Sequence, residues 1–385
     1  MIKSIKVRLY PNKAQSQLLN QHFGSVRFLY NMGLEYKKRM YTENGIKLTR
    51  YDLINELPKL KEEIEWLKEC KAECLQSTYD NLDKAFVNFY RGAGYPKFKS
   101  RKSSNQSFVQ KQNIRFKNDK IVFLGNSIKF KCSDNDRDFL QSCKTKFITY
   151  TKDNLNNYYA SITFKHKSIK KAPLNNSVGI DLGISNFIVT SDGEFVDNPK
   201  FYRKSEKKLK KLQRKNSKCK KGSKNREKAR IRYAKAAKKV ADKRNYFLHS
   251  VANKLINENQ VISFETLNVS GMMKNHKLAK SIQDAAWARL IQIVSYKAEW
   301  YSREVNKIGR FVPSSKTCSA CGEVNNELRL KNRVFECTKC GYKEDRDLNA
   351  SKNIKNFSRD ELTRINASGE TVTRPSVKEE DTIVS

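Results

Sequence analysis

The stretch SVGIDLGISNFIVTSDGEFV, residues 177–196, predicts two strands joined by a short turn. An apolar run through Val178 and Ile180 leads directly into Asp181, and a second run, FIVTS, ends at an Asp-Gly pair typical of a hairpin. An unpaired carboxylate at the end of a buried strand is costly unless a cation or hydrogen-bond donors meet it. Taken alone, Asp181 is explained equally well as a turn residue that accepts backbone hydrogen bonds.

The stretch VISFETLN, residues 261–268, repeats this arrangement. Apolar residues again lead to an acid, here Glu265, at the end of a predicted strand. Two carboxylates at two strand ends favour a metal site over two unrelated turns, because carboxylate oxygens are ligands of divalent cations. Asp181 and Glu265 are therefore candidate metal ligands.

Four cysteines form the most specific local motif. They follow the pattern CxxC, fifteen intervening residues, CxxC, with a glycine after each pair that permits a tight turn: Cys318, Cys321, Cys337 and Cys340, followed by Gly322 and Gly341. Four thiolates at this spacing suit tetrahedral Zn²⁺ in a closed structural site, which leaves no position for a catalytic water. A redox CxxC is the remaining interpretation.

The composition indicates a polyanionic partner. The 385 residues include 78 Lys and Arg against 40 Asp and Glu, a formal net charge of +38. Nucleic acid is the leading partner, and a merely well-solvated surface is the alternative. No apolar run approaches the roughly 18 residues of a membrane helix. We therefore expect no membrane partner and a cytoplasmic location.

The charge is concentrated between residues 203 and 244. This segment holds 21 Lys or Arg and three acids, and KKGSKN predicts a turn between two helices. Self-repulsion at this density favours a phosphate partner over a solvated helical hairpin. The candidate nucleic-acid-binding residues are Lys207, Lys208, Lys210, Lys211, Arg214 and Lys215.

The periodicity predicts an α+β protein of several domains. Residues 1–11 and 93–172 carry short alternating strands, which indicate a small antiparallel sheet or β-barrel. Residues 12–92 have apolar residues at three- and four-residue spacing and form a predicted helical insertion. The second sheet and the cysteine motif occupy residues 173–355. Residues 356–385 are polar and without sustained periodicity, so we expect a disordered tail.

Four segments in this order resemble the OrfB/TnpB proteins of bacterial insertion sequences, relatives of the type V CRISPR effectors. They are GIDLGISNF, ISFETLNVSGM, SSKTCSACG and CTKCGYKEDRDLNASKNI. The resemblance implies a RuvC-type, RNase H-like nuclease domain with a zinc ribbon inserted at about 312–344. It also implies a β-barrel (wedge) domain with a helical recognition domain inserted into it, in a bacterial or archaeal cell.

The resemblance assigns three catalytic acids that would bind Mg²⁺: Asp181, Glu265 and Asp347. Asp345, two residues before Asp347, competes for the third place. Three carboxylates from separate segments can hold two divalent ions about 4 Å apart for phosphodiester hydrolysis. The implied partners are a guide RNA and target double-stranded DNA beside a short flanking motif, with one protein chain on one RNA.

Composition and motifs alone predict a nucleic-acid-binding protein and a metal-dependent nuclease. The guide RNA is implied by the resemblance only. Two rival functions stay open: a transposase acting directly on DNA, and a zinc-ribbon regulator that does not cleave. No His-x-His motif of a tyrosine transposase occurs in the sequence, and a pure binding protein has no need of the three acids together.

Overall fold

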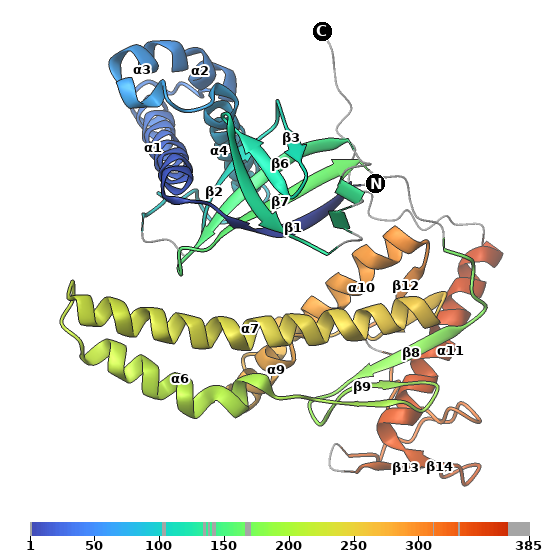
Figure 1. Cartoon of the computed structure of the whole chain (residues 1–385). Helices are drawn as coiled ribbons and strands as arrows, with labels where there is room; N and C mark the ends of the chain where they lie inside the picture. The colour runs from blue at the N-terminus through green and yellow to red at the C-terminus, as the bar shows by residue number, and fades with distance from the viewer. Residues whose placement is uncertain are drawn as a thin grey trace. The chain divides into compact units, whose positions relative to one another are not determined.

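The computed structural model forms two compact units, residues 1–167 and 168–385 (Figure 1). It describes residues 2–101, 105–133, 136–137, 139–140, 144–165, 171–310, 312–329 and 332–368. Within these residues, no helix combines the length and the apolar character that a membrane span requires.

The first unit is built on a seven-stranded antiparallel sheet in the order β2-β6-β7-β1-β5-β4-β3. Its strands are β1 (Ile2–Tyr10), β2 (Asn105–Gln110), β3 (Arg115–Lys117), β4 (Lys120–Phe123), β5 (Asn126–Lys131), β6 (Thr145–Asp153) and β7 (Tyr158–Lys165). The predicted alternation in β1 is confirmed, since Ile5, Val7 and Leu9 are buried. The first strand joins the later strands, between β7 and β5.

Of the two forms that the alternating strands predict, a small antiparallel sheet or a β-barrel, the described ladders show the open sheet. Its edge strands β2 and β3 do not pair with each other in the described ladders. The core is completed by helices instead, because Leu19 and Phe23 of α1 and Cys74 of α4 pack into the same apolar cluster as the strands. The structure is therefore an open sheet covered by helices.

The helical elements between β1 and β2 fall where the periodicity predicts an insertion. They are α1 (Lys13–Asn44), α2 (Arg50–Asn55), α3 (Leu57–Glu63), the 3₁₀ turn η1 (Glu65–Leu67) and α4 (Ala72–Tyr90). Asn12 and Gln15 form a capping box at the start of α1, and the helix ends at Gly45 with φ of 67°. These helices pack a second apolar cluster of their own.

The second unit contains a five-stranded sheet in the order β10-β9-β8-β11-β12. Its strands are β8 (Ser177–Leu182), β9 (Asn186–Thr190), β10 (Phe195–Asp197), β11 (Val261–Phe264) and β12 (Glu304–Lys307). β8, β9 and β10 are antiparallel, whereas β11 and β12 run parallel to β8. The strand that carries Asp181, β8, and the strand that precedes Glu265, β11, thus lie side by side.

Six helices accompany this sheet: α6 (Phe201–Lys218), α7 (Lys224–Glu258), α8 (Val269–Met272), α9 (His276–Ala285), α10 (Trp287–Tyr301) and α11 (Arg346–Ser368). α6 and α7 form a long hairpin (Figure 1). The turn between them falls at the predicted KKGSKN, where Gly222 has φ of 86°. Trp287 is buried in the core of this unit, as expected for a structural aromatic residue.

The cysteine motif folds into a small hairpin directly before α11. Its strands are β13 (Val334–Glu336) and β14 (Lys343–Asp345), and Phe335 is fully buried between the cysteines. α11 continues to Ser368, which corrects the expectation that the chain is disordered from residue 356. The helix is held beyond that point because Ser358 is buried and bonds Ser263 of β11, at 2.8 Å between the hydroxyl oxygens. Residues 369–385 of the predicted tail lie outside the described residues.

Candidate functional site

The first two predicted acids are neighbours across the β8–β11 pair. Phe264 of β11 pairs with Ile180 of β8 in parallel register. The next residue after each of them is an acid, Glu265 in one case and Asp181 in the other. Asp181 lies inside β8, opposite Val189 of β9, rather than beyond the strand. The backbone N–H of Leu182 also donates to the Glu265 carboxylate. Strand register therefore brings together two acids that are far apart in sequence.

The third acid reaches the same edge because α11 packs directly on β8. A methyl group on Gly179 would overlap the backbone oxygen of Ser351 and lie 2.5 Å from the amide nitrogen of Lys355. Only a glycine permits this approach of helix to strand. Asp347 stands one helical turn before Ser351, in the first turn of α11.

Two of the three acids have pKa values that their acidic neighbours raise. Burial raises the pKa of Asp181 well above its usual range, and the negative charges of Glu265 and Asp347 raise it further. Burial also raises the pKa of Glu265 to about 7, with a contribution from Asp347 and opposition from the Leu182 hydrogen bond. Asp181 thus experiences the charges of Glu265 and Asp347, and Glu265 experiences that of Asp347, an arrangement that a divalent cation would stabilise.

The two competing acids before α11 make different contacts. Asp345 Oδ1 accepts from the backbone N–H groups of Asp347, at 2.9 Å, and Leu348, at 3.1 Å, so it caps the helix. The Asp347 carboxylate faces two guanidinium groups, at 3.0 Å from Arg346 and 3.7 Å from Arg333. The Asp345 carboxylate therefore caps the helix, and the Asp347 carboxylate is paired with positive charge from two arginine side chains.

The four predicted cysteines form one cluster. Their sulfur atoms all lie within 4.8 Å of one another, with 3.7 Å between Cys318 and Cys340 and 3.6 Å between Cys321 and Cys337. Thiolates about 2.3 Å from a tetrahedral zinc ion are about 3.8 Å apart, so the cluster fits that ion. The backbone N–H of Cys340 helps lower the pKa of the Cys337 thiol to about 6, which favours the thiolate.

The turns around this cluster use glycine as the sequence predicts. Gly322 has φ of 79° and Gly341 has φ of 73°, a conformation that most side chains disfavour. In each turn the glycine N–H donates to the carbonyl of the first cysteine of its pair. The thiolates are thereby directed to a common point.

Two asparagines of α11 fasten this cysteine hairpin to the helix that carries Asp347. Asn349 accepts from the Ser319 N–H at 2.9 Å and donates to the Thr317 carbonyl at 2.8 Å. Asn353, one turn later, donates to the carbonyls of Ser314, at 2.8 Å, and Thr317, at 2.6 Å. Both side chains are buried. Sequence analysis missed them, and their i, i+4 spacing beside the last acid is the one pattern that could have indicated them.

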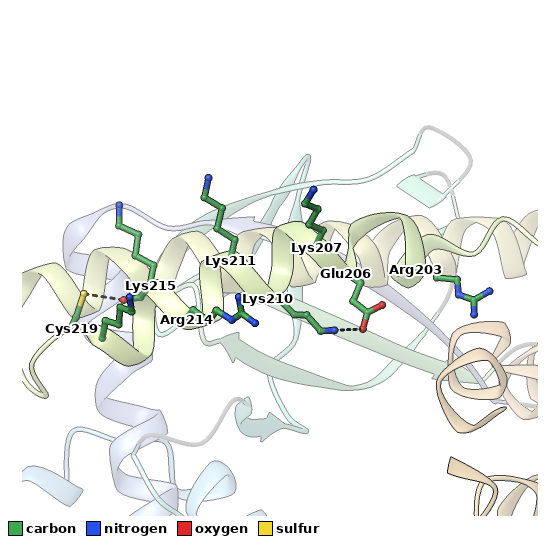
Figure 2. A pocket seen from close by; sticks show the side chains of 9 residues that line it. Arg203, Glu206, Lys207, Lys210, Lys211, Arg214, Lys215 and Cys219 are labelled. Carbon is green, nitrogen blue, oxygen red and sulfur yellow. Dashed lines mark hydrogen bonds and ion pairs between the residues drawn. The ribbon is translucent and has the colours of Figure 1, made fainter. Parts of the chain in front are cut away.

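The predicted basic residues line one face of α6. A cavity of about 870 Å³ is bordered by Lys207, Lys210, Lys211, Arg214 and Lys215, shown in Figure 2. Lys208, the sixth predicted residue, does not line it. The acid of this face, Glu206, pairs with Lys210 at 2.9 Å. The face is thus a concave and almost entirely cationic surface.

Neighbouring acids, a four-thiolate cluster and a cationic groove are features expected of metal-binding proteins that act on nucleic acids. Family comparisons agree with this class. Residues 161–276 match the family described as "Probable transposase", residues 287–354 match "Cas12f1-like, TNB domain", and residues 1–46 match a family described as "Helix-turn-helix domain". In the structure, that last stretch is the strand β1 and the single helix α1.

Several relatives match nearly the whole chain. A Streptomyces pristinaespiralis protein named "Putative RNA-guided DNA endonuclease" is 34% identical over 91% of this chain and 88% of its own. "Putative RNA-guided DNA endonuclease InsQ" of Escherichia coli K12 is 26% identical over 92% and 91%. A solved Cas12f1-sgRNA-target DNA complex has the same fold, with a TM-score of 0.57 at 17% identity over 89% of this chain and 83% of that one. The chain belongs to the OrfB/TnpB family.

Proposed function

We propose that this protein is an RNA-guided DNA endonuclease of a transposable element, which cuts target DNA next to a short flanking motif. The observation that carries the proposal is the convergence of Asp181, Glu265 and Asp347 in a chain whose relatives are named for that activity. The sheet order β10-β9-β8-β11-β12, with three antiparallel strands and then two parallel ones, supports a RuvC-type, RNase H-like core.

The chemistry follows from the three carboxylates. Hard oxygen ligands and a phosphate substrate favour Mg²⁺, which when bound supplies an activated water and neutralises charge on the reacting phosphate. Asp181 and Glu265 are held rigidly by strand register, and Asp347 is held by the packing of α11 on Gly179. In this scheme Asp345 holds the helix end and takes no direct part.

The cysteine cluster has a structural role in this proposal. All four ligand positions of a tetrahedral Zn²⁺ are filled by protein thiolates, so no position is left for substrate. The ion stabilises the hairpin, and Asn349 and Asn353 join the hairpin to α11. Zinc therefore supports the position of the third acid.

The basic groove of α6 and the first unit are proposed to bind nucleic acid. Cationic side chains bind phosphate without regard to sequence, and base pairing with the guide RNA supplies sequence specificity. The open sheet and helices of residues 1–167 are proposed to hold the guide RNA and the duplex beside the target. One chain on one RNA is the assembly we expect.

The protein with its copurified RNA and the same protein freed of RNA are the two samples that test this proposal against its rivals. We expect the protein purified from its host to carry a discrete RNA, identified by sequencing, and the complex to cut only DNA complementary to that RNA. RNA-free protein that cuts any DNA as efficiently as the complex contradicts the guided function. A complex that binds its DNA target but never cuts it supports the regulator instead.

A further inference from the structure

A second cavity lies in the second unit, between the turn that follows β8, the start of α6 and the helix α9. Its volume is about 450 Å³. Among its lining residues are Ile184 and Ser185 of the turn, Lys200 and Arg203 of the α6 start, and Lys277 and Lys280 of α9. None of these residues belongs to the groove residues that the sequence singled out.

The cavity adjoins the basic groove and the turn that follows Asp181. Arg203 and Glu206 line both the groove and the cavity, and they mark the end of the groove in Figure 2. At the other end, Ile184 stands three residues after Asp181. The Asn198 side chain donates to the Ile184 carbonyl at 3.0 Å and so ties this turn to the segment before α6.

The acids of the cavity are already neutralised. Asp284 accepts from the backbone N–H of Tyr202, at 2.9 Å, and pairs with Arg244 at 2.6 Å. Glu206 pairs with Lys210 and with Lys280, the latter at 3.1 Å.

Three cations remain. In the described part of the chain, no acid pairs with the side chains of Lys200, Arg203 or Lys277, all of which are exposed. The cavity therefore presents a surplus of positive charge.

Lys200 also has an unusual backbone. Its φ of 49° and ψ of 48° lie in the left-handed region, where a lysine is disfavoured by roughly 1 kcal/mol. Asn adopts this left-handed conformation at a lower energetic cost than Lys. Strain of this kind gathers where a side chain is needed for binding.

We propose that this cavity binds a backbone phosphate of the DNA strand that enters the acid cluster, through Lys200, Arg203 and Lys277. The proposal rests on the proposed nuclease function. The ligand is a phosphodiester because the unpaired groups are all cations. DNA rather than guide RNA is the source because the cavity opens beside the turn that follows Asp181, where the strand to be cut must pass.

The test compares Lys200→Asn/Lys277→Gln with the matched control Lys204→Gln/Lys274→Gln, which removes the same charge from exposed positions that do not line the cavity. Both pairs are placed in an Asp181→Ala background that retains its copurified RNA. The probe is a fluorescent single-stranded oligothymidine. We expect the cavity pair to weaken binding about tenfold and to flatten the salt slope by about 0.7, the value for one phosphate of a single strand.

Two further readouts complete the test. Lys200→Asn alone should leave the unfolding temperature unchanged or raise it, so weaker binding does not reflect misfolding. Lys200→Arg/Lys277→Arg should retain binding.

Equal effects of the cavity pair and the control pair overturn the proposal. Loss of copurified RNA with oligothymidine binding unchanged also overturns it, because the cavity would then hold the guide. The oligothymidine result remains decisive for the cavity even if wild-type protein proves unable to cut guided DNA.

Discussion

Gly179 of β8 and Ser351 of α11 are in such close contact that no side chain fits between them. This contact fixes the distance between the strand that carries Asp181 and the helix that carries Asp347. We expect Gly179→Ala to destabilise the second unit by about 3 kcal/mol or more, since the methyl group meets backbone atoms that cannot move aside. Chemical denaturation measures the loss.

Gly24→Ala is the control for this substitution. Gly24 lies within α1, and a methyl group there meets nothing within 4 Å. The expected change is neutral or stabilising by about 0.5–1 kcal/mol, because alanine is the better helix former. A Gly179→Ala protein as stable as Gly24→Ala would show that α11 is free to move from β8.

Asp345 is expected to act as a helix cap. Asp345→Ala should cost about 1 kcal/mol of stability, whereas Asp345→Asn should cost little because Asn also caps helices. DNA cleavage by the RNA complex should follow the same order, with Asp345→Asn close to wild type. If Asp345→Asn removed cleavage as completely as Asp347→Asn, Asp345 would be a metal ligand.

Asn349 is expected to couple zinc to the third acid. Asn349→Ala removes the partner of the Ser319 N–H and one of the two donors to the Thr317 carbonyl, which keeps its bond from Asn353, at a cost of about 1–3 kcal/mol. Zinc should then be released faster to a chelator, and cleavage should require more Mg²⁺. Asn356→Ala, at an exposed position of the same helix, is the control. Unchanged zinc release in Asn349→Ala would refute the coupling.

The first unit should lose stability in mild acid through His22. This buried residue has Nδ1 at 2.9 Å from the Leu18 carbonyl, and its Nε2 accepts from the Lys71 N–H at 3.3 Å, so the neutral ring fits the site. Burial, followed by the charge of Lys71, lowers the pKa of His22 below 6.5. A lowered folded-state pKa means that the unfolded chain takes up the proton first. The stabilisation is therefore complete above about pH 6.5 and is lost as the pH falls from there toward the lowered value.

The slope in this window should approach about 1.4 kcal/mol per pH unit. Hydrogen exchange of α1 amides between pH 7.5 and 5 measures it. His22→Gln should flatten the dependence, while His249→Gln, in the second unit, should leave α1 unaffected. An identical pH dependence in wild type and His22→Gln would contradict this assignment.

The sequence was sufficient for the features that depend on local pattern. Apolar runs that end in an acid identified Asp181 and Glu265, and the CxxC spacing identified a cluster whose sulfur atoms do meet. Helical periodicity likewise placed the insertion between the first two strands.

Features that depend on distant contacts were beyond the sequence. Asp345 and Asp347 are the same residue type, and only their contacts distinguish a helix cap from a carboxylate that is paired with arginine side chains. The asparagine contacts join residues 30 or more positions apart. The choice between an open sheet and a barrel also stayed open, because it depends on which distant strands pair at the edges. The sequence did not indicate Lys200 as a binding residue, because its left-handed backbone conformation is set by the surrounding turn.

The proposed nuclease function depends most on the three carboxylates forming one catalytic centre. The most direct measurement is DNA cleavage and DNA binding by the RNA-loaded protein with Asp181→Asn, Glu265→Gln or Asp347→Asn in turn. We predict that each loses Mg²⁺-dependent cleavage by about 10³-fold or more, while target binding stays within a few-fold of wild type. Full cleavage by any one of the three would contradict a shared centre at the β8–β11 edge.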